Sequence, residues 1–422
     1  MTKAPKILTE LFWLEHLHRI EAYLDRGGYQ ALKKALTEMK PEQVQEEVKK
    51  ANLRGRGGAG FPAGVKWGFI PKGTDKPKYL CVNADEGEPG TFKDRYILNH
   101  NPHLLIEGIV LAAYAVGIHS AYVYIRGEYE MIARRLEQAV AEAYAKGYLG
   151  RNILGAGFDL DLVVHRGAGA YICGEETALL ESLEGKRGNP RLKPPFPALV
   201  GLFQCPTVIN NVETLSNVPF IVQKGAAWFL EQGLPKDGGT RLFGVSGAVA
   251  KPGLYELPAG TSLREIITTH AGGMKDGKKL KAVIPGGMSS PILRADEIDV
   301  RMDVDSIAAA GSMLGSGAII VIDEGTPILH VLRKIAKFYA HESCGQCTPC
   351  RLGTSWIHKI VERMAAGGGT RGDVDTLIRL AGNIKGRTLC PLGDAAAMPV
   401  TAIAQKFRTE LEATLERSPV WP

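Results

Sequence analysis

Hydrophobic positions divide the chain into four regions, and the first of these, residues 1–50, repeats at helical spacing. A Gly27-Gly28 pair interrupts the pattern, so two amphipathic helices are predicted, the second ending near Lys50. The apolar positions of the first predicted helix are Leu11, Leu14, Leu17 and Ile20. A glycine-rich stretch, residues 54–62, follows the second helix.

Residues 70–235 alternate short apolar runs with longer helical patterns. The short runs predict strands at residues 79–82, 121–125 and 160–164. Helical spacing predicts helices at residues 103–116, 132–148 and 178–183. Such alternation is typical of a mostly parallel sheet that helices cover on both faces.

The pattern changes near residue 240 and again beyond Pro327. The middle region predicts a compact α+β unit of about 85 residues, beginning with a hairpin. Its strands are expected at residues 242–247, 251–258, 282–284 and 318–322, and its helix at residues 262–270. The last region, of about 95 residues, predicts a small bundle of four helices. The four apolar faces carry Ile328, Val331, Leu332, Ile335 and Phe338; Ile357, Ile360, Val361 and Met364; Val374, Leu377 and Ile378; and Ile403, Phe407, Leu411 and Leu415.

These changes of pattern predict domain boundaries near residues 75, 238 and 325. Residues 1–75 are expected to hold the N-terminal helices and the glycine-rich stretch. An α/β domain follows at 76–238, to which 54–66 contributes, and then the α+β domain at 239–325 and the bundle at 326–422.

Composition and charge exclude several classes of protein. The chain has 422 residues, of which 45% are hydrophobic and 23% charged, as is ordinary for a globular protein. The net charge of +6 is spread along the chain, so nucleic-acid binding is not expected. No segment approaches the roughly 18 uninterrupted apolar residues of a membrane span, and the start lacks the apolar run of a signal peptide. We therefore expect a reducing, cytoplasmic location.

Four of the seven cysteines form the most informative motif. Cys344, Cys347 and Cys350 are spaced every third residue, and Cys390 follows forty residues later, directly before Pro391. This spacing favours an iron–sulfur site, in which a distant fourth thiolate completes the ligand set. Zinc is the first alternative, although it usually takes paired ligands around a tetrahedron. The second is a group of buried structural cysteines, which has little use in a reducing compartment.

The glycine-rich stretch contains the pattern G-x-G-x-x-G at Gly55, Gly57 and Gly60. A dinucleotide-binding fingerprint also needs a strand before it and a helix after it. Here the preceding residues read as helical and Phe61-Pro62 follows, so that interpretation fails on context. The backbone amides of such a loop can still approach a phosphate closely, although a flexible hinge is the alternative.

Three further polar segments stand where a sheet would present ligands. Residues 83–91 directly follow a predicted strand, and ligands of α/β sheets bind beyond the carboxyl ends of strands. Residues 166–177 lead through glycines into a helix, and residues 210–214 are either a helix cap or a ligand contact. The alternatives are a solvated acidic loop for the first segment and dipole-stabilising carboxylates for the second.

Six motifs together resemble the NADH-binding flavoprotein subunit of respiratory complex I, also called the 51-kDa or F subunit of NADH:quinone oxidoreductase. The motifs are Arg54–Phe61, Asn83–Arg95, Gly167–Glu176, Asn189–Pro197, Asn210–Thr214 and Glu342–Cys350. The resemblance covers nearly the whole chain. It implies a Rossmann-like α/β domain that binds FMN, an α+β ubiquitin-like domain of the SLBB kind, and an all-α four-helix bundle that holds a 4Fe–4S cluster.

The resemblance also implies roles for individual residues. Glu88 would position the nicotinamide, which makes it the catalytic candidate. The FMN-binding residues would be Gly55, Arg56, Gly57, Gly58, Gly60, Lys66, Asn83, Asp85, Glu86, Tyr171, Gly174, Glu175, Asn210 and Asn211. The NADH-binding residues would be Phe61, Phe69, Glu88, Glu176, Lys193 and Phe196. The cluster ligands would be Cys344, Cys347, Cys350 and Cys390.

The implied activity is NADH dehydrogenation with electron transfer through FMN and the cluster toward quinone. The implied partners are a small 2Fe–2S subunit of the 24-kDa or E type and a large iron–sulfur subunit of the 75-kDa or G type. The complex would hold the protein on the inner face of a bacterial membrane. The nearest alternative is the diaphorase subunit of an NAD(P)-linked hydrogenase or formate dehydrogenase. Many of these carry extra cluster domains, which this chain lacks. A non-catalytic scaffold is a further alternative.

Overall fold

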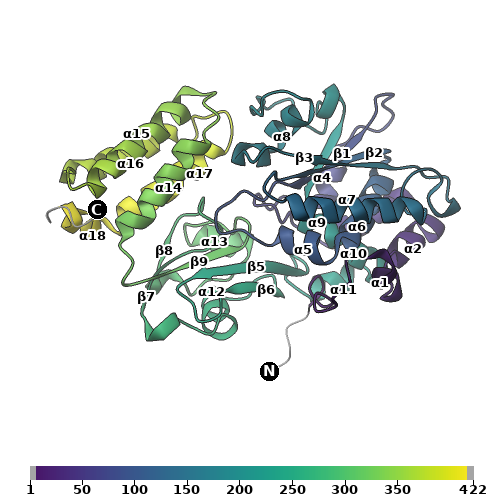
Figure 1. Ribbon diagram of the computed structural model, residues 1–422, viewed down its shortest axis with the longest axis horizontal. Helices are drawn as coiled ribbons and strands as arrows, with labels where there is room; N and C mark the ends of the chain where they lie inside the picture. The colour runs from purple at the N-terminus through teal and green to yellow at the C-terminus, as the bar shows by residue number, and fades with distance from the viewer. Residues whose placement is uncertain (1–5, 416–422) are drawn as a thin grey trace.

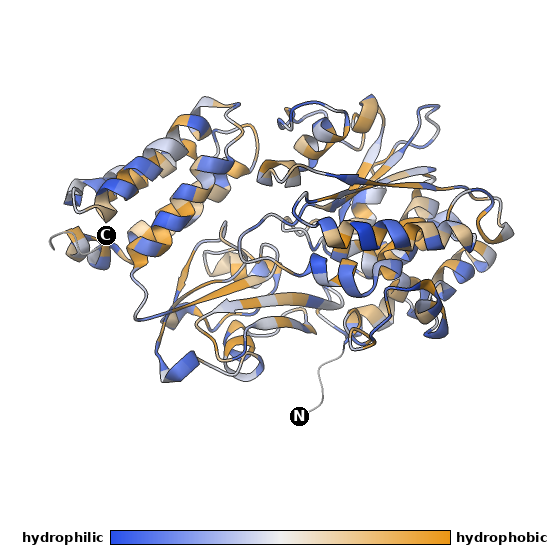
Figure 2. Ribbon diagram, viewed as in Figure 1, coloured by the Kyte–Doolittle hydropathy of each residue, from blue (hydrophilic) through white to orange (hydrophobic). Residues whose placement is uncertain are grey.

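The computed structural model describes residues 6–415, which form three groups of elements (Figure 1). A four-stranded sheet with its helices lies at one end of the molecule, and the C-terminal helices lie at the other. A five-stranded sheet lies below both in this view. Apolar and polar residues alternate around the C-terminal helices, as amphipathic helices require (Figure 2).

The first predicted helix is largely wrong. The segment before Ile20 forms successive turns closed by bonds between residues three apart, such as Leu14 N to Leu11 O, and helix α1 covers only Ile20–Asp25. The cause lies at the start of the segment, where the Glu256 carboxylate accepts hydrogen bonds from three consecutive amides. The amide-to-oxygen distances are 2.8 Å for Ile7, 2.9 Å for Leu8 and 2.7 Å for Thr9.

The second predicted helix is two helices, α2 (Gln30–Glu38) and α3 (Pro41–Lys50). Proline has no amide hydrogen, so Pro41 cannot continue α2 but fits the first position of α3. A short helix, α4 (Ala63–Trp67), follows the glycine-rich loop directly.

The predicted parallel sheet is confirmed, with neighbouring strands in the order β3-β2-β1-β4. Its strands are β1 (Tyr79–Ala84), β2 (Ser120–Ile125), β3 (Asp161–Arg166) and β4 (Thr207–Asn211), of which β4 was not predicted. Its helices are α5 (Asp94–His100), α6 (Pro102–Val116), α7 (Glu130–Ala145), α8 (Glu176–Leu183), α9 (Val212–Ser216), α10 (Val218–Lys224) and α11 (Ala226–Glu231), with 3₁₀ turns η1 (Ile153–Gly155), η2 (Tyr171–Gly174) and η3 (Leu202–Gln204).

Alternate residues of β1 enter two different cores, so helices cover the sheet on both faces. Leu80 and Val82 pack in a core that includes α3, α6 and α7, whereas Cys81 packs against Ile172 and Leu179 on the other face.

The second sheet has the order β6-β5-β9-β7-β8. Its strands are β5 (Thr240–Gly247), β6 (Gly253–Pro258), β7 (Leu280–Ile284), β8 (Leu293–Arg294) and β9 (Ala318–Asp323). The predicted hairpin is the antiparallel pair β5–β6, and β9 pairs with β5 in parallel. The predicted helix is α12 (Leu263–Glu265) followed by the π-helical turn η4 (Ile266–His270). Strand β8, the short turns η5 (Lys275–Gly277) and η6 (Ala295–Glu297), and helix α13 (Val304–Ala309) were not predicted.

Five helices, not the expected four, end the described chain. They are α14 (Ile328–Glu342), α15 (Thr348–Ala365), α16 (Arg371–Ile384), α17 (Leu392–Lys406) and α18 (Arg408–Leu415). The last predicted helix is wrong because the chain breaks at Phe407 into α17 and α18, and α17 begins earlier and contains Pro399. No helix within residues 6–415 is long and apolar enough to cross a membrane.

One hydrophobic core joins the three groups of elements. It contains Ile172 and Leu179 beside the first sheet, Ile284 and Ile322 from the second, and residues of α14 to α18 such as Leu332. Burial of this shared apolar surface fixes the C-terminal helices against the turn η2 and helix α8.

The buried Glu256 carboxylate provides a test of how the N-terminal segment is held. We expect Glu256→Ala to lower the free energy of unfolding by about 3 kcal/mol, because it leaves buried amides without an acceptor. Urea unfolding measures this change, and limited proteolysis should show new cleavage within residues 7–19. Glu265→Ala, at a half-exposed carboxylate, is the matched control. Equal loss in both variants would contradict the proposed anchor.

Candidate active site

The sequence motifs meet where strand order reverses in the first sheet. Strands β1 and β4 are parallel neighbours, yet β2 and β3 continue from β1 in the opposite direction. The carboxyl ends of two such strands diverge and leave a crevice, which is where open α/β sheets bind ligands. Asn83 of β1 and Asn211 of β4 are register partners at this edge, and Asp85 follows directly.

The glycine-rich loop packs against this edge. A Cβ atom at Gly57 would lie 3.1 Å from Cβ of Asn211, so only glycine allows this approach without displacement. Gly58 and Gly60 have φ angles of 126° and 67°, a region that other residues rarely adopt. The bond from Gly55 N to Phe61 O, 2.9 Å, closes the loop. The loop therefore brings backbone within reach of a ligand in the crevice.

The Arg56 side chain points away from the crevice into the protein. Its guanidinium donates to Asp237 Oδ1 at 2.6 Å and to the carbonyls of Gly238 and Thr240 at 2.7 and 3.1 Å. Its own amide donates to Thr214 Oγ1 at 2.9 Å. Arg56 thus ties the glycine-rich loop to the start of β5, and its charge is already neutralised by Asp237.

The turn η2 forms a third wall of the crevice. Asn83 Nδ2 donates to the carbonyl of Gly174 at 2.8 Å, and a Cβ atom at Gly174 would lie 3.4 Å from the carbonyl oxygen of Asp85. The Oδ2 atom of Asp85 is buried and has no hydrogen-bond partner. Burial raises the pKa of Asp85 to about 7. An unpartnered buried acceptor at the end of a strand is a position that a ligand hydroxyl or N–H would satisfy.

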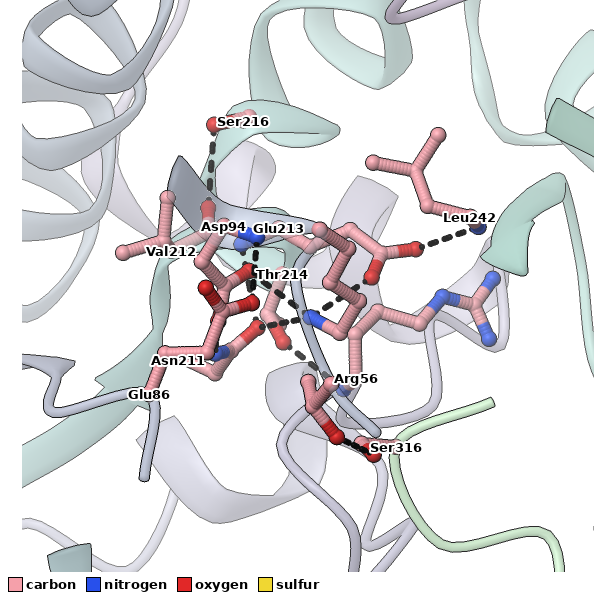
Figure 3. A network of polar contacts seen from close by, with 12 residues as sticks. Arg56, Glu86, Asp94, Asn211, Val212, Glu213, Thr214, Ser216, Leu242 and Ser316 are labelled. Atoms are coloured by element: carbon pink, nitrogen blue, oxygen red, sulfur yellow. Dashed lines mark hydrogen bonds and ion pairs between the residues drawn. The ribbon is translucent and has the colours of Figure 1, made fainter. Parts of the chain in front are cut away.

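Two other predicted ligands have side chains that the protein already uses. Glu86 accepts from the amide of Asp94 at 2.7 Å and from the Tyr129 hydroxyl at 2.8 Å. Asn211 caps α9 by accepting from Glu213 N at 3.0 Å and donates to Asp94 Oδ2 at 2.6 Å. Figure 3 shows these side chains directed toward one another within the network. Asn210 is similar, since its amide oxygen accepts from Trp67 Nε1 at 2.8 Å.

A buried lysine, Lys93, lies at the centre of that network and was missed in the sequence. Its Nζ atom lies 2.7 Å from Asp94 Oδ1 and 2.8 Å from Glu213 Oε2. Burial favours the neutral amine, but the two carboxylates outweigh burial and raise the pKa of Lys93. Glu213 also accepts from Leu242 N of β5 at 3.1 Å. No local signal identifies Lys93, because Glu213 is distant in the sequence.

Glu88 faces both the first and the second sheet. Its carboxylate accepts from the Tyr171 hydroxyl at 2.7 Å and from the Ser289 amide at 2.7 Å. Burial raises the pKa of Glu88, and these two hydrogen bonds partly offset that rise. Glu88 is therefore held in one orientation by donors from two separate elements.

Charged residues alternate at the start of α8. Glu176 lies between Lys66, at 3.2 Å, and Lys193, at 3.1 Å, and Lys193 also lies 3.0 Å from Glu175. Burial opposes ionisation of Glu176, yet the two ammonium groups outweigh it and lower its pKa. Glu175 is the N-cap of α8 and accepts from the amides of Thr177 and Ala178. The dipole explanation expected from the sequence thus applies to Glu175.

The three predicted aromatic contacts are exposed, which is unusual for phenylalanine. Phe61 and Phe69 are 47% and 54% exposed, with ring centroids 5.9 Å apart. Phe196 is 57% exposed and lies on a different segment, within residues 190–200. Exposed flat rings beside paired charges can stack on a flat ligand.

The four motif cysteines lie at helix ends and carry free thiols. Cys344 follows α14, Cys347 is the N-cap of α15, Cys350 lies in its first turn, and Cys390 precedes α17. Burial raises the pKa of the Cys390 thiol to about 12, and Glu175, Cys344 and Cys350 are near enough to add to that rise. Two helix N-termini beside these thiols favour negative charge there.

The thiols suit a cluster better than a single ion. Within residues 6–415, no three Cys, His, Asp or Glu side chains converge closely enough to hold one metal ion. In a 4Fe–4S cluster each thiolate binds a different iron, so the four sulfur atoms surround a larger body. The zinc alternative is therefore less suited to this geometry.

Three family models match the chain in order. The Nuo51 FMN-binding domain matches residues 48–220, the SLBB domain matches residues 241–322, and the NADH-ubiquinone oxidoreductase-F iron-sulfur binding region matches residues 330–414.

Curated relatives match over nearly their whole length, and all three named here are F subunits of NADH-quinone oxidoreductase. The chain is 58% identical to the second such protein of Rhizobium meliloti, over 94% of this chain and 95% of the relative. It is 55% identical to that of Mycobacterium tuberculosis (92% and 88% covered) and 50% identical to that of Rickettsia bellii (99% and 100% covered).

Among solved structures, an NAD+-reducing [NiFe]-hydrogenase in the H2-reduced state superposes with a TM-score of 0.85 at 39% identity. The match covers 94% of this chain and 67% of the hydrogenase chain. The fold is thus an FMN-binding α/β domain, an SLBB domain and a helical iron–sulfur region, in that order. The chain belongs to the family of NADH-quinone oxidoreductase F subunits.

Proposed function

We propose that this chain is the NADH dehydrogenase subunit of an NADH:quinone oxidoreductase, with FMN and a 4Fe–4S cluster as its cofactors. The supporting observation is the turn η2, which joins two sites: Gly174 lies at the crevice beside Asp85, and Tyr171 packs on Phe338 of the helix that precedes the cysteines. When bound, FMN supplies chemistry that side chains lack, since it takes a hydride and returns electrons one at a time.

The crevice residues suit FMN in three ways. The glycine-rich loop, residues 55–60, would place backbone amides against the phosphate, with Lys66 supplying positive charge. Asp85 would accept a hydrogen bond from a ligand hydroxyl or N–H, which would satisfy its unpartnered Oδ2 atom. Asn83, Tyr171, Gly174, Glu175, Asn210 and Asn211 would complete the walls. Arg56 and Glu86 would contribute backbone, because their side chains are bound within the protein.

The charged and aromatic residues beside the crevice would bind NADH. Phe61, Phe69 and Phe196 would stack on the adenine end, and Lys193 and Glu176 would bind its polar groups. Glu88, fixed by Tyr171 and Ser289, would orient the nicotinamide. Hydride transfer depends on orientation more than on acid–base groups, so no catalytic histidine is needed.

The four cysteines would hold the 4Fe–4S cluster, which relays single electrons when bound. Iron binds thiolates, so loading would release the protons that burial keeps on Cys350 and Cys390. The domain division that supports this arrangement is residues 1–75, 76–238, 239–325 and 326–422, with 54–66 joining the second.

The names of the curated relatives indicate that the chain is part of a multi-subunit complex. Within that complex we propose a small 2Fe–2S subunit and a large iron–sulfur subunit as its neighbours, on the cytoplasmic face of the bacterial membrane. A diaphorase of an NAD(P)-linked hydrogenase is the second candidate, because the superposed hydrogenase shares the fold. It is less well supported, since identity is 39% against 50–58% for the NADH-quinone oxidoreductase relatives.

The first experiment is an anaerobic NADH titration of the purified protein. We expect bleaching of a flavin absorbance band and an EPR signal from a reduced 4Fe–4S cluster, both at stoichiometric NADH. A protein that contains neither flavin nor iron after anaerobic preparation would overturn the proposed function in favour of the scaffold alternative. Repeating the titration with NADPH measures the preference for NADH.

Cys390→Ser separates the two cofactors. We expect the 4Fe–4S EPR signal to be lost or strongly altered, while flavin content and its bleaching by NADH remain, because Cys390 lies on the bundle side of the site. Cys205→Ser is the matched control, since Cys205 is also half-buried but lies outside the motif. Retention of an unaltered cluster signal in Cys390→Ser would exclude Cys390 as a ligand.

Asp85 gives a pH dependence whose sign follows from burial. Its pKa rises from 3.8 to about 7 on folding, so the unfolded chain loses this proton first and stability falls between pH 4 and 7. We expect Asp85→Asn to raise the free energy of unfolding of flavin-free protein by up to about 4 kcal/mol at pH 8, and by nothing at pH 3.5. Denaturant unfolding at the two pH values measures the difference. A pH-independent effect would contradict the assignment.

A further inference from the structure

Glu342 occupies a position that its charge does not favour. It is the last residue of α14, and a carboxylate at a helix C-terminus lies beside the negative end of the helix dipole. It is also two residues before Cys344, in a stretch that is only partly buried. A residue in such a place needs a compensating contact, and the structure supplies one from another part of the chain.

That contact is the backbone amide of Tyr171. Tyr171 N donates to Glu342 Oε2 at 3.1 Å. Tyr171 is the first residue of the turn η2, where an amide has no acceptor within the turn itself. Glu342 therefore caps η2 from a different domain. The Tyr171 ring lies against α14 as well, 5.1 Å from the Phe338 ring and 6.2 Å from the Tyr339 ring, measured between centroids.

On one side, this contact leads to the crevice. The same Tyr171 donates its hydroxyl to Glu88, and Gly174, at the other end of η2, accepts from Asn83. Glu342 is also close enough to Asp85 to add to the rise in its pKa that burial causes. The carboxylate is thus attached to the wall that would contact FMN and the nicotinamide.

On the other side, the contact leads to the cysteine loop. Ser343 follows Glu342, and its hydroxyl lies 3.2 Å from Cys350 Sγ and accepts from the amide of Gly345 at 3.4 Å. Arg187, from the α/β domain, donates to the carbonyl of Cys344 at 3.2 Å. Glu342 and Arg187 are therefore two polar contacts from the flavin side to the segment that carries the cysteines.

We propose that Glu342 is a positioning residue that fixes the cysteine loop against the turn η2, and so sets the separation between the FMN site and the cluster. The inference rests on the proposed function. It assigns the role to the hydrogen bond that the carboxylate accepts, because the shared hydrophobic core already holds the helices together without it. Electron transfer between two sites depends on their relative placement, and displacement by about 1 Å at a reacting pair can cost on the order of a hundredfold in rate.

Three substitutions separate the hydrogen bond from the charge. Glu342→Gln keeps an acceptor of the same length and removes the charge. Glu342→Asp keeps the charge and withdraws the acceptor by one methylene. Glu342→Ala removes both. Glu362→Ala is the matched control, because Glu362 also joins α14 to α15, through Arg333 at 2.8 Å, but lies near the far end of α15.

The measurements use the purified protein with flavin and iron content determined first. Hydrogen exchange reports protection of the amides of Tyr171 and Gly345. EPR of the NADH-reduced protein reports the cluster, and stopped-flow absorbance compares the rate of flavin bleaching with that of cluster reduction. For Glu342→Ala and Glu342→Asp we expect faster exchange at Tyr171 and cluster reduction slowed by roughly tenfold, with flavin bleaching unchanged. Glu342→Gln and Glu362→Ala should resemble the wild type.

Each other outcome decides against the inference. If Glu342→Asp behaves as wild type and Glu342→Gln does not, charge and not the hydrogen bond is responsible. If exchange at Tyr171 and cluster reduction are unchanged in Glu342→Ala, Glu342 positions nothing. If Glu342→Ala fails to fold, the comparison of Gln with Asp still decides. Absence of flavin bleaching in the wild type would instead overturn the proposed function, independently of Glu342.

Discussion

The ion cluster around Lys93 is the interaction on which the arrangement of the site depends. One ammonium group, 2% exposed, binds Asp94 at the start of α5 and Glu213 in α9, and Glu213 in turn accepts from the backbone of β5. The cluster therefore joins the α/β domain to the first strand of the second sheet. Removing one partner of such a buried set is destabilising by about 3–5 kcal/mol, because the remaining charge has no counterion.

This cluster also explains which side chains are left to face a ligand. Glu86 and Asn211 are bound to Asp94 and its neighbours, and Arg56 is bound to Asp237. Asp85, one residue before Glu86, has an oxygen atom without any partner. The crevice is thus lined mainly by backbone and by a few open groups, on a frame whose charges are neutralised internally. Such a frame is rigid before a ligand arrives, which reduces the ordering cost of binding.

The sequence predicted elements well where local pattern decides the structure. Continuous apolar runs identified β1, β2 and β3, and helical spacing identified α6 and α7, because burial on both faces leaves a clear local signal. Local pattern failed where a distant group decides. Leu11 to Leu17 have helical spacing, but Glu256 holds the residues before them in an extended path.

The candidate site was predictable to a similar degree. The loops could be found because each follows a strand or contains glycines, and the cysteines because of their spacing. The spacing could not reveal that the side chains of Arg56 and Glu86 turn inward, since their partners, Asp237 and Tyr129, lie elsewhere in the sequence. Lys93 could not be found either, because a buried lysine and an exposed one look alike in a sequence. Nothing local could have connected Tyr171 with Glu342.

The division of the hydrophobic residues between cores has a consequence for synthesis on the ribosome. The core around β1, α3, α6 and α7 draws its buried residues from Ile7 to Leu242, so it is complete before the cysteines have been translated. The core that holds the thiols needs residues as late as Leu411. Domains generally fold as units, beginning from the N-terminus during synthesis. The flavin side can therefore be folded while the nascent chain still lacks every cluster ligand, which separates the maturation of the two cofactor sites in time.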